Sequence, residues 1–109
     1  MTDRELLELA AKAAGYDVVF VHDNKIPMRR DVPNRKGMKV WNPLEDDGDA
    51  LRLAVKLQLQ IRPNDYDVMV VARLPAHITA AEVCDHKYQC AATRRAITRA
   101  AAEIGRHMP

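Results

Sequence analysis

Two cysteines and a histidine stand close together in the second half of the chain and are of the types that bind zinc. Cys84, His86 and Cys90 are common zinc ligands, and His77 lies a short way upstream. The spacing fits poorly, because Cys84 and His86 are too close for the usual two-residue knuckle and a fourth ligand is not evident. We therefore expect no bound metal, and interpret both cysteines as small buried side chains and His86 as a surface residue.

Basic residues gather in the segment 25–39 and again near the C-terminus. The candidate binding residues are Lys25, Arg29, Arg30, Arg35, Lys36, Lys39, Arg94, Arg95 and Arg99. Such side chains contact phosphates, so a nucleic-acid-binding module is one interpretation. The order of elements partly resembles the double-stranded RNA-binding fold, but that family's lysine-rich signature and an aromatic stacking pair are missing. The competing interpretation is a solvated loop and a solvated helix face.

Four carboxylates occur together, at Glu45, Asp46, Asp47 and Asp49. Clustered carboxylates can bind a divalent cation. The same residues stand where a helix is predicted to begin, and the N-terminal end of a helix favours negative charge and aspartate caps. We therefore interpret this group as helix caps and not as a metal site.

The familiar catalytic motifs are missing from the sequence. It contains no G-x-S-x-G sequence, no phosphate-binding loop and no pair of catalytic carboxylates at a recognisable spacing. A cysteine nucleophile and a histidine base can be drawn from the 77–90 stretch, but no third group that would orient them is evident. We expect a protein without enzymatic activity and without a cofactor.

Composition indicates a single globular domain over residues 1–109. Hydrophobic residues make up 48% of the chain and charged residues 29%, a balance typical of folded domains. The net charge of +2 favours no particular class of partner. The N-terminus is polar and the apolar runs are short, so we expect no membrane segment, no secretion signal and a cytoplasmic location with free thiols.

Capping signals and helical periodicity predict three helices, over residues 3–14, 47–60 and 91–105. Thr2 and Glu5 form a capping box before the first helix, and Gly15 supplies its left-handed C-terminal cap. Leu51 and Val55 widen the apolar stripe of the second helix, which is therefore expected to be central and well covered. Gly105 is expected to end the third helix.

Runs of β-branched residues predict strands over 17–22, 37–41 and 67–72. The first two are expected to pair antiparallel across residues 23–36, whose prolines and asparagines predict a loop. The strand 67–72 is apolar throughout, which favours an interior position. For residues 78–84 a short helix and a strand both remain open.

The predicted fold class is α+β, with the order α-β-β-α-β-(β)-α. A mainly antiparallel sheet of three to four strands with helices packed on it accommodates this order. Helices on both faces of that sheet would give an α/β/α sandwich.

Three blocks of the sequence resemble parts of small proteins of tailed bacteriophages and prophages, namely residues 5–15, 41–57 and 91–101. They are similar to the phage "ABA sandwich" type of domain, in which a tryptophan-proline turn leads into a helix and an alanine- and arginine-rich helix closes the chain. The resemblance implies a three-layer fold and a phage or prophage origin, hence a bacterial host cytoplasm. It implies no activity, and it leaves out residues 24–36 and 74–90.

These observations lead to the hypothesis of a non-enzymatic accessory protein that binds a host or phage protein. The binding surface is expected on the basic 25–39 segment and on the arginines of the last helix. A nucleic-acid-binding module that uses the same residues is the alternative, and its affinity would fall steeply with salt.

Overall fold

The computed structural model describes residues 1–32, 37–72, 78–83 and 88–109, with the backbone alone at Val83. Within these residues the chain forms three helices and two antiparallel sheets of three strands each. The α+β class with mainly antiparallel strands is confirmed. The observed order, α-β-β-β-α-β-β-β-α, adds one strand after the first strand and one after the second helix.

The first helix, α1 (Asp3–Ala14), forms over the predicted residues. The Thr2 hydroxyl accepts a hydrogen bond from the Glu5 amide at 3.2 Å, as a capping box requires. The Glu5 carboxylate accepts from the Thr2 hydroxyl, and not from the Thr2 amide as the capping box predicts. Gly15 adopts the left-handed conformation, with φ of 76°, and ends the helix.

The first sheet has the strand order β1-β2-β3, with β1 (Val18–Val21), β2 (Ile26–Arg29) and β3 (Lys39–Val40). The prediction of a loop over 23–36 was therefore wrong for β2, and so was the pairing of 37–41 with the first strand. The sequence does not predict β2 as a strand because Pro27 lacks the amide donor that a central strand normally uses. Its carbonyl nevertheless accepts from the Trp41 amide at 3.0 Å.

The turn between β1 and β2 is made by three consecutive residues with positive φ. His22, Asp23 and Asn24 have φ values of 53°, 61° and 62°. These three residue types are enriched in the left-handed region among non-glycine residues. The hairpin therefore forms without the glycine that normally signals such a turn.

The second helix, α2 (Asp47–Lys56), ends four residues before the predicted position. Gln58 adopts a left-handed conformation with φ of 54°, and the Leu59 amide then donates to the Ala54 carbonyl at 2.9 Å. This is the Schellman pattern that closes a helix, here without glycine. The chain continues directly into β4 (Gln60–Pro63).

The second sheet has the order β4-β5-β6, with β5 (Asp67–Ala72) in the centre and β6 (Ile78–Val83) at one edge. The predicted strand 67–72 and its interior position are confirmed. The strand alternative for the region after residue 78 is also confirmed.

The third helix, α3 (Gln89–Arg106), extends beyond Gly105, so the prediction that this glycine ends the helix was wrong. A Cβ atom added at Gly105 would overlap the backbone carbonyl of Leu9. Gly105 is therefore a packing glycine that lets α1 and α3 approach each other closely.

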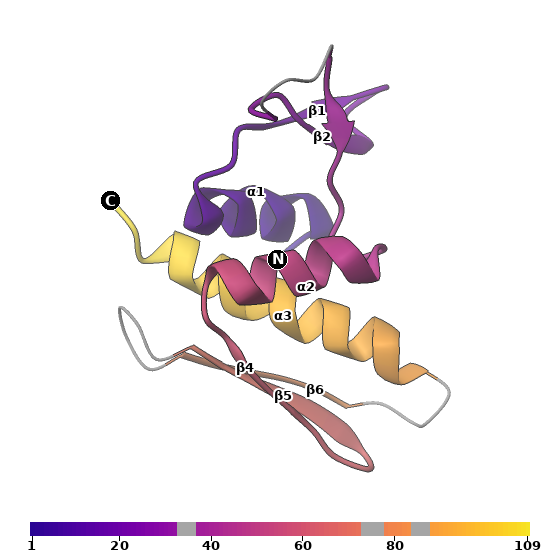
Figure 1. The fold of residues 1–109 in the computed structure, drawn as a ribbon, viewed down its shortest axis with the longest axis vertical. Coiled ribbons are helices and arrows are strands. Elements are labelled where there is room, and N and C mark those ends of the chain that lie inside the picture. Colours follow the sequence, from indigo (N-terminus) through magenta and orange to yellow (C-terminus); the bar gives the residue numbers. More distant parts are fainter. Residues whose placement is uncertain (33–36, 73–77, 84–87) are drawn as a thin grey trace.

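The helices lie in one layer with a sheet on either side of it (Figure 1). Helix α3 runs along α1 and packs against the β4-β5-β6 sheet, and α2 lies beside α3 (Figure 1). The small β1-β2-β3 sheet sits on the opposite side of the helices. This order of layers differs from an α/β/α sandwich, in which helices cover both faces of one sheet.

The core is built largely from small residues of the helices and valines of β5. Its fully buried members include Ala10, Ala100 and Ala101. Trp41, which is 3% exposed, joins the small sheet to this core and meets Tyr16 edge to face, with ring centroids 5.7 Å apart. This contact links the end of β3 to the residue that follows the C-terminal cap of α1.

Candidate functional site

Arg94 holds the start of α3 against the segment that leads into α2. Its Nε donates to the Leu44 carbonyl at 3.0 Å, and its Nη1 contacts the Asp47 carboxylate at 2.6 Å. The side chain is 18% exposed. Arg94 therefore links α3 to the start of α2 and has a structural role.

Arg95 and Arg99 are also paired, on the side of α3 that faces α1 and β6. Arg95 contacts Asp3 at 3.0 Å, and Arg99 contacts Glu82 at 2.7 Å. Arg99 also donates to the carbonyl of Ala81 at 2.7 Å. The three arginines expected on a solvated face thus contact carboxylates of three other parts of the chain.

Two arginines of the predicted basic segment form two-point ion pairs. Nε and Nη2 of Arg29 donate to the two carboxylate oxygens of Asp31 at 3.0 and 3.2 Å. Nε and Nη2 of Arg30 donate to the two carboxylate oxygens of Asp17, both at 3.0 Å. The hydrogen bonds to Asp31 raise the pKa of Arg29, and the same bonds lower the pKa of Asp31. The Arg29 guanidinium also stacks over the Tyr16 ring at 3.7 Å from its centroid.

The remaining residues of that segment fall into two groups. Lys25 and Lys39 are exposed and have no ionic partner among the residues that the structure describes. Arg35 and Lys36 lie outside the described residues.

A basic cluster, consisting of Arg29, Lys39, Arg52 and Lys56, forms where β2 and β3 meet α2. Arg29 and Lys39 are direct cross-strand partners in the register. With Arg52 of α2 they line a small cavity of about 80 Å³. The Lys56 ammonium lies 5.7 Å from the centroid of the Tyr16 ring. Arg52 and Lys56 were not among the candidates predicted from the sequence, although their spacing of four residues places them on one face of the helix.

The acidic group caps α2, as predicted. Asp46 is the N-cap and accepts from the Asp49 amide at 2.8 Å. Asp49 is 6% exposed, and its two carboxylate oxygens accept from the Asn42 amide at 3.0 Å and from Arg52 at 2.9 Å. In the part of the chain that the structure describes, no group of three histidine, cysteine or acidic residues is arranged to hold a metal ion.

The residues considered as zinc ligands are placed only in part. Cys84, His86 and His77 lie outside the described residues. Cys90 is an exposed free thiol in the first turn of α3, so its interpretation as a buried side chain was wrong.

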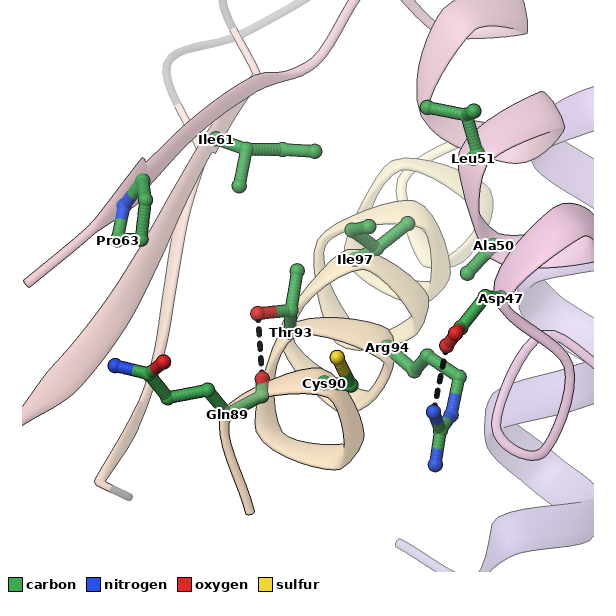
Figure 2. Close-up of a pocket in the computed structure, with 10 residues that line it drawn as sticks. All are labelled: Asp47, Ala50, Leu51, Ile61, Pro63, Gln89, Cys90, Thr93, Arg94 and Ile97. Carbon is green, nitrogen blue, oxygen red and sulfur yellow. Dashed lines mark hydrogen bonds and ion pairs between the residues drawn. The ribbon is translucent and has the colours of Figure 1, made fainter. Parts of the chain in front are cut away.

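An apolar groove of about 300 Å³ lies between α2, β4 and α3 (Figure 2). Its lining side chains are Asp47, Ala50, Leu51, Ile61, Pro63, Gln89, Cys90, Thr93, Arg94 and Ile97. Ile61 and Leu51 face the space from opposite sides, and Ile97 lies between them on α3 (Figure 2). Leu51 is 60% exposed and the nearby Val55 is 69% exposed, so the prediction that α2 is well covered was wrong on this face.

The β4 strand forms one wall of the groove and is an edge strand of its sheet. The Asn64 amide donates to the Asp67 carbonyl at 2.8 Å, which makes these two residues a hydrogen-bonded pair of the hairpin. Antiparallel ladders alternate, and in this register the N–H and C=O of Ile61 therefore point away from β5. Among the described residues, the N–H and C=O of Ile61 therefore have no strand partner on this side of the groove.

The other edge of the same sheet, β6, is different. The alternation directs the Ala81 carbonyl away from β5 as well. That carbonyl is occupied, since Arg99 donates to it. A side chain of α3 therefore covers an outward-pointing carbonyl of β6.

Comparison with family models, with curated proteins and with solved structures finds no match to this chain. Among the helices formed by the described residues, none combines the length and apolar character that crossing a membrane requires.

Proposed function

We propose that this chain is a non-enzymatic protein-binding module whose apolar groove receives an extended segment of a partner protein. The observation that carries this proposal is the position of the groove, of about 300 Å³, directly beside the open edge of β4. Burying apolar surface is favourable by about 25 cal/mol per Å². An exposed leucine, an isoleucine and a proline along one groove supply such surface.

The groove and the strand edge suit the same ligand. A partner strand that pairs with Ile61 gains two backbone hydrogen bonds, and every second side chain of that strand then points into the groove. The remaining side chains face solvent. The ion pair between Asp47 and Arg94 provides a polar rim at the α3 side. This combination favours an extended segment with alternating apolar residues.

The biological setting of this proposal rests on the sequence resemblance alone. An accessory protein of a phage or prophage would act in the cytoplasm of the bacterial host, on a host or phage protein. The alternative, a nucleic-acid-binding module that uses the nine candidate basic residues, has less support. Five of them, Arg29, Arg30, Arg94, Arg95 and Arg99, are engaged in ion pairs within the chain.

Two substitutions on α2 test the groove. Leu51→Asp places a charge in the groove, and Val55→Asp makes the same change at an exposed residue of α2 that does not line it. Affinity capture from the source cells identifies the partner, and calorimetry with the purified partner gives the dissociation constant. We expect Leu51→Asp to raise that constant at least tenfold, since burial of a leucine contributes about 1.5–3 kcal/mol.

The Val55→Asp control shows whether a loss of binding is specific to the groove. Val55→Asp should change the dissociation constant by less than about twofold, because surface changes outside an interface cost little. If the two variants weaken binding equally, or if neither weakens it, the partner does not occupy the groove.

A further inference from the structure

We propose that the basic cluster binds a phosphate group in the small cavity between β2, β3 and α2. This site is separate from the apolar groove, and its observations are independent of the function proposed above. Three cationic side chains, Arg29, Lys39 and Arg52, line the cavity.

The register puts two cations directly opposite each other. Arg29 and Lys39 are cross-strand partners, and like charges in this position destabilise a strand pair. Asp31 compensates Arg29, but Lys39 has no ionic partner among the described residues. A bound anion between the two strands would remove this repulsion.

The carboxylates near the cavity position the two guanidinium groups and leave donors available. Asp31 accepts from Nε and Nη2 of Arg29, and Asp49 accepts from Nη2 of Arg52. Nη1 of each arginine has no acceptor among the residues that the structure describes. Fixed guanidinium groups with free N–H donors are the common means of phosphate recognition.

Asp49 also lines the cavity, and its negative charge has to be accounted for. Both of its oxygens already accept hydrogen bonds, one from the Asn42 amide and one from Arg52. Lys39 and Lys56 have no carboxylate partner in the part of the chain that is described. Asp46 also lies 3.8 Å from Nη2 of Arg52, so the four cations of the cluster face three carboxylates, Asp31, Asp46 and Asp49. An excess of one positive charge remains.

The size of the cavity and the state of Tyr16 select the ligand class. The cavity, of about 80 Å³, is much smaller than the apolar groove, of about 300 Å³, and its size suits a compact anion such as a five-atom phosphate group. The Tyr16 ring already carries Arg29 and Lys56 over it and meets Trp41 at its edge. Base stacking on this ring is therefore not available, and the ligand is a phosphate, on a small molecule or in a nucleic-acid backbone.

Titration with inorganic phosphate at low ionic strength, followed by amide chemical shifts, tests the site. Lys39→Ala removes one cation from the cavity, and Lys25→Ala removes the same charge from an exposed lysine outside it. We expect phosphate to shift the amides around Arg29, Lys39 and Arg52. Lys39→Ala should weaken binding about tenfold, because it removes a charged hydrogen-bond donor from the cavity. Lys25→Ala should leave the affinity unchanged, and Lys39→Arg should retain most of it.

A short DNA duplex in place of phosphate distinguishes the two sources. If the duplex binds and Lys39→Ala weakens it, the phosphate belongs to a nucleic acid. If phosphate binds and the duplex does not, the ligand is a small phosphate compound, and the site stands in both cases. The site is overturned if phosphate shifts no amide of the cluster, or if Lys25→Ala weakens binding as much as Lys39→Ala.

Discussion

Paired side chains determine how individual charged residues of this chain behave. Arg29 illustrates this most fully, because it forms a two-point contact with Asp31 and stacks on Tyr16 at the same time. A guanidinium held in this way has lost much of its rotamer freedom, so each further contact that it makes costs less entropy. The pair also has a measurable pH dependence.

The first prediction concerns the titration of Asp31. The hydrogen bonds from Arg29 lower its pKa below the ordinary value. Because the folded-state pKa is the lower one, the pair stabilises the fold fully above about pH 4, and this stabilisation is lost as the pH falls through the folded-state pKa. A carboxyl carbon NMR titration should give a midpoint for Asp31 below that of an ordinary aspartate.

Two variants complete this measurement. Arg29→Met should return the midpoint of Asp31 to the ordinary range, and Arg30→Met, which frees Asp17 instead, should leave Asp31 unchanged. A midpoint that stays low in Arg29→Met would show that another group causes the shift.

At the scale of elements, the register of β4 leads to a prediction for the chain without any partner. The Arg62 amide points toward β5, whereas the Ile61 amide points to the open edge. Hydrogen exchange of Ile61 should therefore be at least about tenfold faster than that of Arg62, whose exchange requires the strand pair to open. Equal protection of the two amides would contradict the register, and protection of Ile61 on addition of a partner would support strand addition.

Helix packing gives another prediction, at Gly105. Gly105→Ala should lower the free energy of unfolding by about 1–3 kcal/mol, because a Cβ at this position overlaps the backbone of α1. Gly48→Ala, in the first turn of α2, meets only nearby side chains and should change stability by less than about 1 kcal/mol. Urea unfolding of both variants makes the comparison, and a neutral Gly105→Ala would contradict the close approach of α1 and α3.

The elements that the sequence predicted well carry their signals locally. The capping box before α1 and the apolar run of β5 need no information from the rest of the chain. The incorrect predictions concern residues whose structure depends on contacts with distant parts of the chain. Pro27 predicts a break in the chain, yet β2 forms because it pairs with β1 on one side and β3 on the other. Gly105 has the sequence signal of a helix cap, although it lies inside α3 and allows α1 to pack closely.

The candidate sites were less predictable than the fold for the same reason. The basic segment included Arg29 and Lys39, but the two residues that complete the cluster come from the next helix, α2, and only the tertiary fold brings them beside the small sheet. The groove depends on how α2, β4 and α3 approach one another, and periodicity assigned Leu51 to the core. Pairings such as Arg94 with Asp47 follow from tertiary structure alone.

At the scale of the whole molecule, one buried cluster connects α1, α2 and α3 with β5 and β6, and Trp41 belongs to it. Trp41 is the one tryptophan in the sequence, so its fluorescence reports on the junction with the small sheet. We expect urea unfolding followed by this fluorescence and by far-ultraviolet circular dichroism to give the same midpoint. A fluorescence transition at lower urea would mean that the small sheet unfolds by itself and that the chain is not one cooperative domain.

The alanines of the packing seam, formed where α1 and α3 meet each other and the β4-β5-β6 sheet, also limit how this chain can change over evolutionary time. Ala10, Ala96, Ala100 and Ala101 are fully enclosed. Alanine has no side-chain torsion to restrict, so this seam forms at almost no rotamer cost, but it also holds no flexible group that can move aside for a larger neighbour. We expect descendants of this chain to vary freely on their outer faces while keeping alanine, glycine or serine along this seam.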